Sequence, residues 1–212
     1  MRDHRGKVMA ALRLVLARHG QTTANAEGIL DTRLPGHPLT EEGHRQAVEL
    51  ADRLAVEPVV AVYASQALRA QQTAKPIAAR HGLTAQVLGG VHEVAIGDLE
   101  GRQQPEDHRT LHEVYRAWHC GDLHAAAPGG ESGSQVLDRY LTDVATIRAN
   151  HSGGTAVLVS HGAATRLAIV ALANNVEGAF AEPRYLPNAA TVLLEVDGDG
   201  WRCLRWDGID LI

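Results

Sequence analysis

The feature that most constrains the fold of this chain is a repeated pattern, in which a short apolar run precedes a longer segment with helical periodicity. The apolar runs at 12–17, 59–64 and 156–159 have the length and composition of strands buried on both faces. Such strands alternating with helices predict a three-layer α/β/α sandwich around a mainly parallel sheet. Hydrophobic residues make up 45 % of the 212 residues, which is enough to build the core that this class needs.

The segments between these runs carry signals for helix starts and for turns. Thr40 is a typical helix cap, and the acidic Glu41 and Glu42 after it suit the first turn of a helix. Ser132 and Gln135 form the pattern of a capping box. With the apolar periodicity, these signals predict a helix after Thr40, helices at about 66–81, 104–118, 132–149 and 163–174, a long loop over 20–39, a short strand over 84–88 and a hairpin over 191–206.

Charge and cysteine content narrow the classes of function. The net charge of −5 argues against nucleic acid or an anionic membrane as a partner. Cys120 and Cys203 lie far apart, which argues against a disulfide framework or a cysteine-based metal site. The sequence has no apolar run of membrane-spanning length and no signal-peptide pattern. We therefore expect a cytoplasmic protein with one domain over 1–212, of which 1–11 is flexible.

Two of the predicted strands end in a histidine that is followed by glycine. These histidines are His19 and His161, and ligands of open α/β sheets bind where the carboxyl ends of such strands meet. Arg18 precedes the first histidine, and Arg69 lies near the start of the helix after the second strand. A single histidine at a strand end is usually structural. Two histidines and two arginines at the ends of three strands instead indicate a site for a dianion. A guanidinium group binds two phosphoryl oxygens at once, through two parallel N–H groups.

Five segments of the chain carry motifs that occur together in one family. They are Arg-His-Gly-Gln-Thr-Thr-Ala-Asn at 18–25, the Ser-x-x-x-Arg-Ala-x-x-Thr-Ala helix at 65–74, Glu-x-x-x-Gly-x-x-Glu-Gly at 93–101, Pro-Gly-Gly-Glu-Ser at 128–132 and Val-Ser-His-Gly at 159–162. In this order they resemble the histidine phosphatase superfamily, specifically its phosphoglycerate mutase-like branch. The resemblance extends from residue 14 to the C-terminus and implies the phosphoglycerate mutase-like fold.

The resemblance also implies an activity and the residues that carry it. It implies a metal-independent phosphoric monoester hydrolase of the histidine acid phosphatase type, acting without a cofactor on a small phosphorylated metabolite. His19 would accept the phosphoryl group as phosphohistidine, while Arg18, Arg69 and His161 hold the phosphoryl oxygens. Glu93 would protonate the leaving group and then take a proton from water, a role that burial in the pocket would favour. The expected lesser contacts to substrate are Gln21, Thr22, Asn25 and Gly162.

Two alternatives to hydrolysis are compatible with the same motifs. Mutases of this branch usually carry an extra insertion over the site, and the short segment after Glu93 favours a phosphatase over phosphoglycerate mutase-type transfer. A phosphate-binding module without turnover is the second alternative, although the whole catalytic set is present. We expect residues 102–130 to form a cap over the substrate. The sequence does not predict the substrate, which could also be a phosphoprotein, or the oligomeric state.

Some charged and titratable side chains near the motifs have no clear role. Asp31 could repel an acidic substrate and Arg33 could attract one, so their effects oppose each other. His108, His112 and His119 lie on the helix of the expected cap. The spacing of the first two would suit a metal ion on one helical face, but no carboxylate motif supports such a site. We therefore expect these histidines to form part of a solvated cap surface.

Overall fold

The computed structural model describes residues 11–211, in which one sheet has the strand order β3-β2-β4-β1-β5-β6-β7. The strands are β1 (Leu12–Arg18), β2 (Val59–Ser65), β3 (Gln86–Leu88), β4 (Gly154–Ser160), β5 (Thr191–Asp197), β6 (Gly200–Trp206) and β7 (Ile209–Asp210). The strands from β3 to β1 pair in parallel, and the predicted hairpin adds antiparallel strands beyond β1. The predicted mainly parallel sheet is therefore confirmed. The flexibility predicted for 1–11 concerns residues that, except for Ala11, lie outside the described part.

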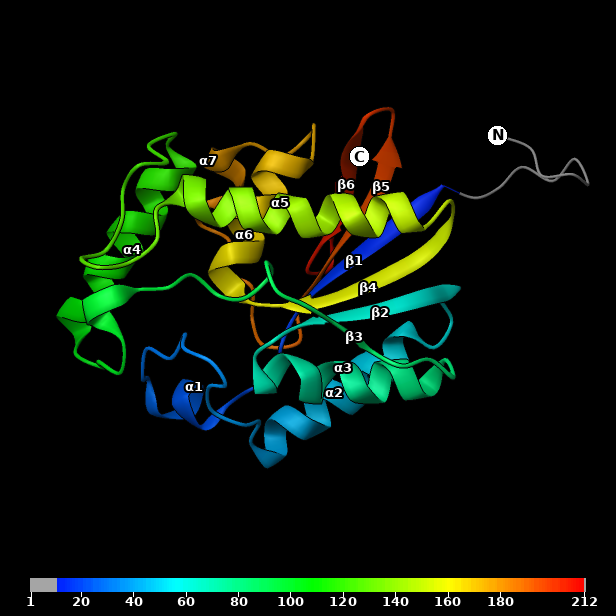
Figure 1. The fold of residues 1–212 in the computed structure, drawn as a ribbon, viewed down its shortest axis with the longest axis horizontal. Coiled ribbons are helices and arrows are strands. Elements are labelled where there is room, and N and C mark those ends of the chain that lie inside the picture. The colour runs from blue at the N-terminus through cyan, green and yellow to red at the C-terminus, as the bar shows by residue number, and fades with distance from the viewer. Residues whose placement is uncertain (1–10, 212) are drawn as a thin grey trace, which may run out of the picture.

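Helices cover both faces of this sheet, as the predicted three-layer sandwich requires (Figure 1). They are α1 (Thr23–Glu27), α2 (Glu41–Leu54), α3 (Leu68–Arg80), α4 (Pro105–His119), α5 (Gly133–Asn150), α6 (Gly162–Leu172) and α7 (Gly178–Ala181), with a 3-10 turn, η1 (Gly97–Leu99). Helices α2 and α3 pack on one face, and α5 and α6 pack on the other. No helix within residues 11–211 has both the length and the apolar character to cross a bilayer.

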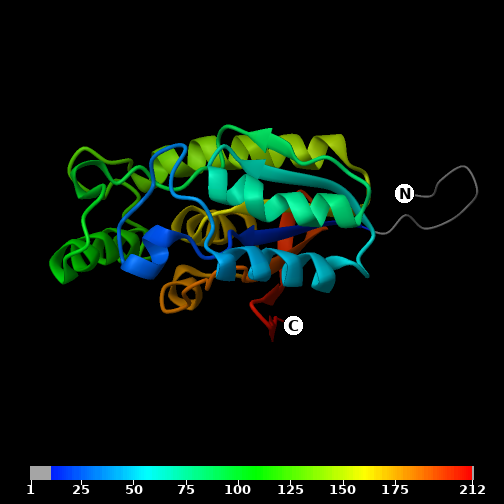
Figure 2. The ribbon, with the colours of Figure 1, turned by 90° about the horizontal axis from the view of Figure 1, so that it is seen from below.

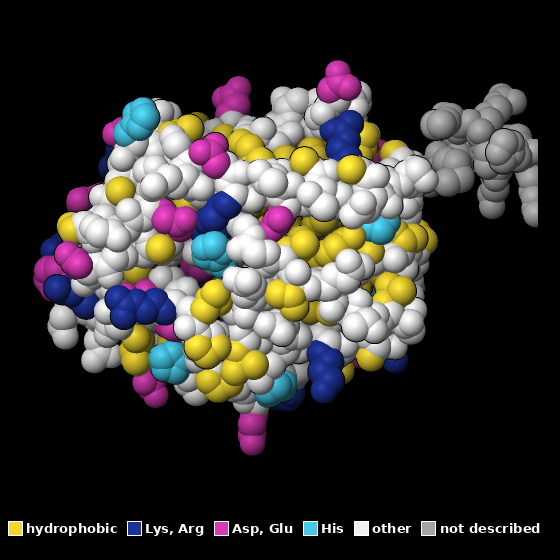
Figure 3. All heavy atoms as spheres, viewed as in Figure 1, with side chains coloured by type: hydrophobic (Ala, Val, Ile, Leu, Met, Phe, Trp, Pro, Cys, Tyr) yellow, Lys and Arg dark blue, Asp and Glu magenta, His cyan; other side chains and the backbone are white. Residues whose placement is uncertain are grey.

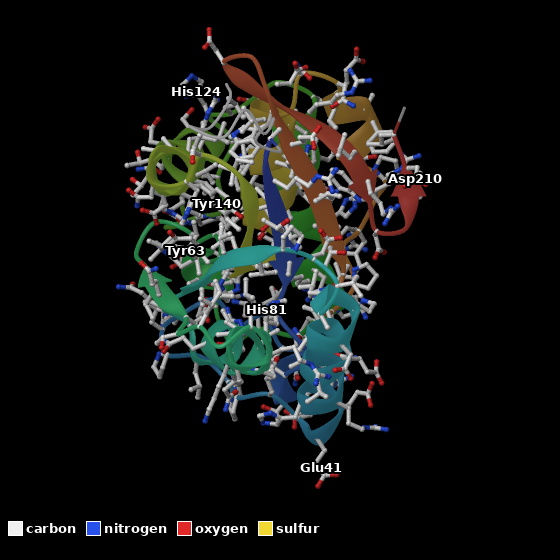
Figure 4. The ribbon with its side chains drawn as sticks, turned by 90° about the vertical axis from the view of Figure 1, so that its right-hand side faces the viewer. Glu41, Tyr63, His81, His124, Tyr140 and Asp210 are labelled. Carbon is white, nitrogen blue, oxygen red and sulfur yellow. The ribbon has the colours of Figure 1, made fainter. Side chains whose placement is uncertain are left out.

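Alternation along β1 shows how both faces of the sheet are filled. Leu14 and Leu16 belong to the apolar cluster under α5 and α6, whereas Val15 and Ala17 belong to the cluster under α2 and α3. Both sets of side chains are buried, which explains why the run is apolar throughout rather than alternating. Tyr140, labelled in Figure 4, extends from α5 into the same cluster as Leu14.

The capping signals in the sequence mark true helix starts. The Thr40 hydroxyl accepts a hydrogen bond from the Gly43 N–H at 3.0 Å and caps α2. Ser132 caps α5 through the predicted box with Gln135. The elements that periodicity missed are the short ones, because α1, α7 and β7 have five, four and two residues. The predicted loop over 20–39 consequently contains one helix, α1.

The carboxyl ends of β1, β2 and β4 meet at one end of the molecule, where α1 and α4 also lie (Figures 1 and 2). Arg18 pairs in register with Ser160, and Ala64 pairs with Val159. The residues that follow β1 and β4 therefore leave the sheet side by side. On the face drawn in Figure 3, charged side chains of both signs gather toward this end of the molecule.

Candidate active site

The rings of His19 and His161 meet edge to face at the carboxyl ends of β1 and β4. Their centroids are 5.2 Å apart, and both side chains are buried. The His19 Nδ1 atom lies 2.8 Å from the carbonyl oxygen of Gly20, which can only accept, so Nδ1 is the donor. Burial, followed by the charges of Arg18 and Arg69, holds the pKa of His19 well below its usual value. The ring is therefore neutral at pH 7, and its Nε2 atom keeps a free lone pair.

His161 is more deeply buried than His19 and is oriented by a serine on the next strand. Its Nε2 atom hydrogen bonds to the Ser65 hydroxyl at 2.7 Å, and Ser65 is the last residue of β2. Within residues 11–211, its Nδ1 atom has no hydrogen-bond partner. Burial, followed by the charge of Arg69, lowers the pKa of His161 well below the ordinary value. His161 is thus a neutral ring held against the edge of His19.

Arg18 and Arg69 supply two nearly buried guanidinium groups to the same cavity as His19. Arg18 donates to the carbonyl oxygen of Leu186 at 2.8 Å and to the Tyr185 hydroxyl, and its guanidinium lies 4.9 Å from the centre of the Tyr185 ring. Arg69 is 2 % exposed, and this burial lowers its pKa, an effect that Asp31 partly offsets. A buried guanidinium stays protonated at neutral pH. The positive charge predicted for the site is therefore present.

Asp31 is the carboxylate partner of Arg69, which answers the question that the sequence left open. Its Oδ2 atom lies 3.3 Å from Nη1 of Arg69, and its backbone oxygen accepts from Nη2 at 3.3 Å. The loop around it is held by Glu100, whose carboxylate accepts from the Thr32 N–H at 2.8 Å and the Thr32 hydroxyl at 2.6 Å. Arg33 is exposed. Of the two opposing charges, Asp31 is the one placed at the site.

The Glu93 carboxylate lies at the N-terminus of α6, the helix that begins directly after His161 in the sequence. Oε2 accepts from the Ala163 N–H at 3.1 Å, and Oε1 accepts from the Ala164 N–H at 2.9 Å. Glu93 also accepts from the N–H of Val94 at 3.0 Å. The first backbone N–H groups of a helix favour an anion at this position. In this state Glu93 is an acceptor, which is the role required for taking a proton from water.

The predicted site residues converge on one cavity of about 410 Å³. Eight of the nine line it, namely Arg18, His19, Gln21, Thr22, Asn25, Arg69, Glu93 and Gly162. The ninth, His161, is not among the lining residues and lies behind His19. A larger hollow of about 490 Å³ between α2 and β5 is lined by none of the nine. The sequence motifs thus select the cavity at the carboxyl ends of the strands.

Three of the expected lesser contacts have bonds within the protein that shape the cavity wall. Thr22 and Asn25 form the capping box of α1, so each side chain accepts from the other's backbone N–H, at 3.1 and 3.2 Å. Asn25 Oδ1 also accepts from Asn188 Nδ2 at 3.1 Å. Gln21 Oε1 accepts from the Thr40 hydroxyl at 2.9 Å. These residues hold the segment after His19 in place.

Helix α4 forms the opposite wall of the cavity with side chains from the expected cap. His108, Leu111, His112 and Tyr115 line the cavity, and His108 Nε2 lies 2.8 Å from the Gly28 carbonyl oxygen. His119 is not among the lining residues; burial, followed by the charge of Arg166, lowers its pKa to about 4. Within residues 11–211, no three His, Cys, Asp or Glu side chains are grouped to hold a metal ion.

Arg166 is a lining residue that the sequence analysis did not select. Its Nη2 atom donates to the carbonyl oxygens of Ala181 at 2.9 Å and Glu182 at 2.5 Å, while its buried Nε has no partner within residues 11–211. No carboxylate of this region lies within ion-pair distance of it. An arginine in the otherwise apolar sequence of α6 was the available signal.

Fold and site together define an α/β protein in which a neutral histidine and two arginines line one cavity at the carboxyl ends of the parallel strands. The sequence model described as histidine phosphatase superfamily (branch 1) matches residues 14–208. The chain therefore belongs to the histidine phosphatase superfamily. The fold class is confirmed by the solved structures that resemble it, and the resemblance seen in the motifs is confirmed by the family match.

The named relatives of the chain include a phosphoglycerate mutase-like protein and a phosphatase. It is 31 % identical over 205 residues to phosphoglycerate mutase-like protein 4 of Arabidopsis thaliana, covering 92 % of this chain and 85 % of that one. It superposes on the mycobacterial glucosyl-3-phosphoglycerate phosphatase complexed with VO3 with a TM-score of 0.81 at 29 % identity, covering 92 % of this chain and 98 % of that one. PE_PGRS11 of Mycobacterium tuberculosis is 32 % identical over 210 residues, but the chain spans 36 % of its length.

Proposed function

We propose that the protein is a metal-independent phosphatase of the histidine acid phosphatase type, which hydrolyses a small phosphorylated metabolite through a phosphohistidine at His19. The observation that carries the proposal is the state of His19. Its Nδ1 atom donates to Gly20, its ring is neutral, its Nε2 atom is free, and Arg18 and Arg69 line the same cavity. A neutral imidazole nitrogen is a nucleophile at pH 7, and two guanidinium groups attract a dianionic phosphate to it.

The reaction has two chemical steps. In the first, His19 Nε2 attacks phosphorus, the bond to the ester oxygen breaks, and Glu93 in its acid form gives its proton to the leaving alkoxide. In the second, water attacks the phosphohistidine while Glu93 takes the proton, which releases phosphate and the free histidine. Arg18 and Arg69 bear the charge that builds up on the phosphoryl oxygens in both transition states. This is the role that a metal ion has in other phosphatases, and no cofactor is needed for it.

His161 supports this chemistry as a third group for the phosphoryl oxygens or as the packing partner of His19. It does not line the cavity, so its contact with substrate requires a shift from its position against Ser65. Helix α4 and the rest of 102–130 form the proposed cap, because four α4 side chains line the cavity. We propose that the chain works as one functional domain, because the strand ends and α4 line the same cavity. The cytoplasmic location and the exclusion of nucleic acid stay predictions from composition.

Arg166 favours a substrate with a second negative group. It lines the cavity, and one of its nitrogens is fixed by backbone oxygens, but it has no carboxylate partner within residues 11–211. Burying a cation without a counterion is costly, and an anionic substituent of the substrate would offset that cost. A compact phosphate ester that also carries a carboxylate or a second phosphate suits this wall.

A screen of phosphate esters tests the proposed function against its alternatives. We expect the purified protein to release phosphate from p-nitrophenyl phosphate and from several metabolite phosphates between pH 5 and 8. Efficient formation of 2-phosphoglycerate from 3-phosphoglycerate with a bisphosphorylated primer would instead establish a mutase. Binding of phosphate without release from any ester would establish the silent binding module.

A further inference from the structure

Arg139, on α5, joins the Pro-Gly-Gly-Glu-Ser segment to the loop that carries Glu93. Its Nε and Nη2 atoms each donate to the carboxylate of Glu131 at 2.8 Å. Its Nη1 atom donates to the carbonyl oxygens of Gly90 at 2.6 Å and His92 at 2.8 Å, and Nη2 also donates to the Glu93 carbonyl oxygen at 3.2 Å. A guanidinium has five N–H groups, and all five are used here.

Glu131 holds the loop on the C-terminal side of Glu93, through Ala95. Its Oε2 atom accepts from the Ala95 N–H at 2.8 Å, and its own N–H donates to the Ala95 carbonyl oxygen at 2.8 Å. Burial would raise the pKa of Glu131, but the hydrogen bonds from Arg139 and Ala95 outweigh this and lower it. Glu131 is therefore ionised at neutral pH, and together with Arg139 it holds the backbone on both sides of Glu93.

The two ends of Glu93 are thus fixed by different helices. Arg139 of α5 holds its backbone oxygen, and the first N–H groups of α6 hold its carboxylate. The loop itself is close to α5, since a Cβ on Gly90 would lie 2.4 Å from the backbone oxygen of Arg139. Arg139 is not among the residues that line the cavity, whereas Glu93, to which it donates, is one of them.

We propose that Arg139, held by Glu131, is a positioning residue for proton transfer by Glu93. The proposal depends on the proposed function, in which Glu93 protonates the leaving group. A general acid acts only within hydrogen-bond reach of the ester oxygen, and small displacements are costly to the rate. Arg139 restricts the backbone of Glu93 so that the carboxyl group can leave the α6 N–H groups, deliver its proton and return.

The leaving group separates this role from a merely structural one. p-Nitrophenolate is a stable anion and departs without a proton, whereas the alkoxide of glycerol 1-phosphate needs one. Loss of proton transfer therefore lowers kcat/KM for glycerol 1-phosphate far more than for p-nitrophenyl phosphate. Misfolding or weaker phosphate binding lowers both values alike. The ratio of the two kcat/KM values thus reports on Glu93 and its position.

The experiment measures this ratio in the 212-residue chain and four variants of it. Glu93→Gln is the benchmark, because it removes the acid itself. Arg139→Lys keeps the charge but has three donors instead of five, and Glu131→Gln removes the negative charge and one of the two acceptor oxygens that face Arg139. Arg148→Ala is the matched control: Arg148 lies on the same helix and donates to the carbonyl oxygens of Gly198 and Asp199, far from the site.

We expect Glu93→Gln to lower kcat/KM for glycerol 1-phosphate about 100-fold or more relative to p-nitrophenyl phosphate. Arg139→Lys and Glu131→Gln should show the same selectivity at about 10- to 100-fold, and Arg148→Ala should leave the ratio unchanged. If Glu93→Gln changes the ratio and neither Arg139→Lys nor Glu131→Gln does, the positioning role is wrong. If Glu93→Gln itself leaves the ratio unchanged, or the wild type hydrolyses neither ester, the proposed function fails and the positioning role fails with it. Should Arg139→Lys not fold, Glu131→Gln decides alone.

Discussion

The carboxylate of Asp31 lies 3.3 Å from the guanidinium of Arg69, on the wall of the cavity where a phosphoryl group is proposed to bind. The ion pair stabilises a buried cation when no substrate is bound. It also opposes anion binding, because a phosphate must share Arg69 with Asp31. Affinity for phosphate is therefore lower than the arginines alone would produce.

Asp31→Asn should strengthen phosphate binding. The amide has the shape of the carboxylate but removes its charge, so inorganic phosphate should inhibit the variant at a roughly three- to tenfold lower concentration. The inhibition constant against p-nitrophenyl phosphate measures this. Glu113→Gln, an exposed substitution on α4, serves as the charge-matched control. Weaker phosphate inhibition of Asp31→Asn would show that Asp31 mainly holds Arg69 in place.

His19→Ala should abolish turnover. Removal of a nucleophile that forms a covalent intermediate lowers kcat by at least about 1,000-fold. Rapid quenching of the wild type with a labelled ester should trap an acid-labile phosphoryl group on His19, and the variant should trap none. A variant that keeps more than a tenth of the activity, or a label on another residue, contradicts the assignment of His19.

His119 should make the protein less stable in acid. Burial lowers its pKa to about 4, so the folded protein resists protonation that the unfolded chain accepts below about 6.5. The unfolded state then binds more protons, and stability falls with pH between about 6.5 and 4, by at most about 1.4 kcal/mol per unit from this group. Urea unfolding at pH 7.5, 6, 5 and 4 measures the trend. His119→Gln should show a shallower loss than the wild type, and equal slopes would exclude this origin.

Arg166→Gln should change substrate preference and leave the chemistry intact. Loss of a charge-assisted hydrogen bond corresponds to about 1.5–3 kcal/mol, or roughly 10- to 100-fold in kcat/KM for a substrate with a second negative group. We expect this loss for 3-phosphoglycerate and little change for p-nitrophenyl phosphate. An equal loss on both esters would show that Arg166 acts on the phosphoryl group or on folding.

The fold and the central site could be predicted because their signals are local. A continuous apolar run such as 12–17 indicates a strand buried on both faces, and in an α/β sheet the residues after such strands must meet. His19, His161 and Arg18 follow from this rule together with the family motifs. Arg69 follows from its place at the start of the next helix.

The interactions that orient these groups could not be predicted, because they join segments that are far apart in the sequence. Periodicity and local motifs do not show which of these segments come together. Asp31 reaches Arg69 from a loop, and Glu131 reaches the Glu93 segment through Arg139. The motif acids Glu100 and Glu131 are visible in the sequence, but their role as anchors appears only in three dimensions. Arg166 is the one charged residue of α6, but the apolar residues around it indicate only that the helix is buried. They do not show which side of the helix faces the cavity.

The strand order also has a consequence for how the chain is made. Strand β1 carries the proposed nucleophile at its end, but its two neighbours in the sheet, β4 and β5, come much later in the sequence, at 154–160 and 191–197. The edges of β1 therefore lack these partners until residues 154–160 and 191–197 have been synthesised, and such late, long-range pairing slows folding. A chain that ends before β4 therefore has the proposed nucleophile but lacks the cavity wall formed by Gly162, Ala163 and Arg166.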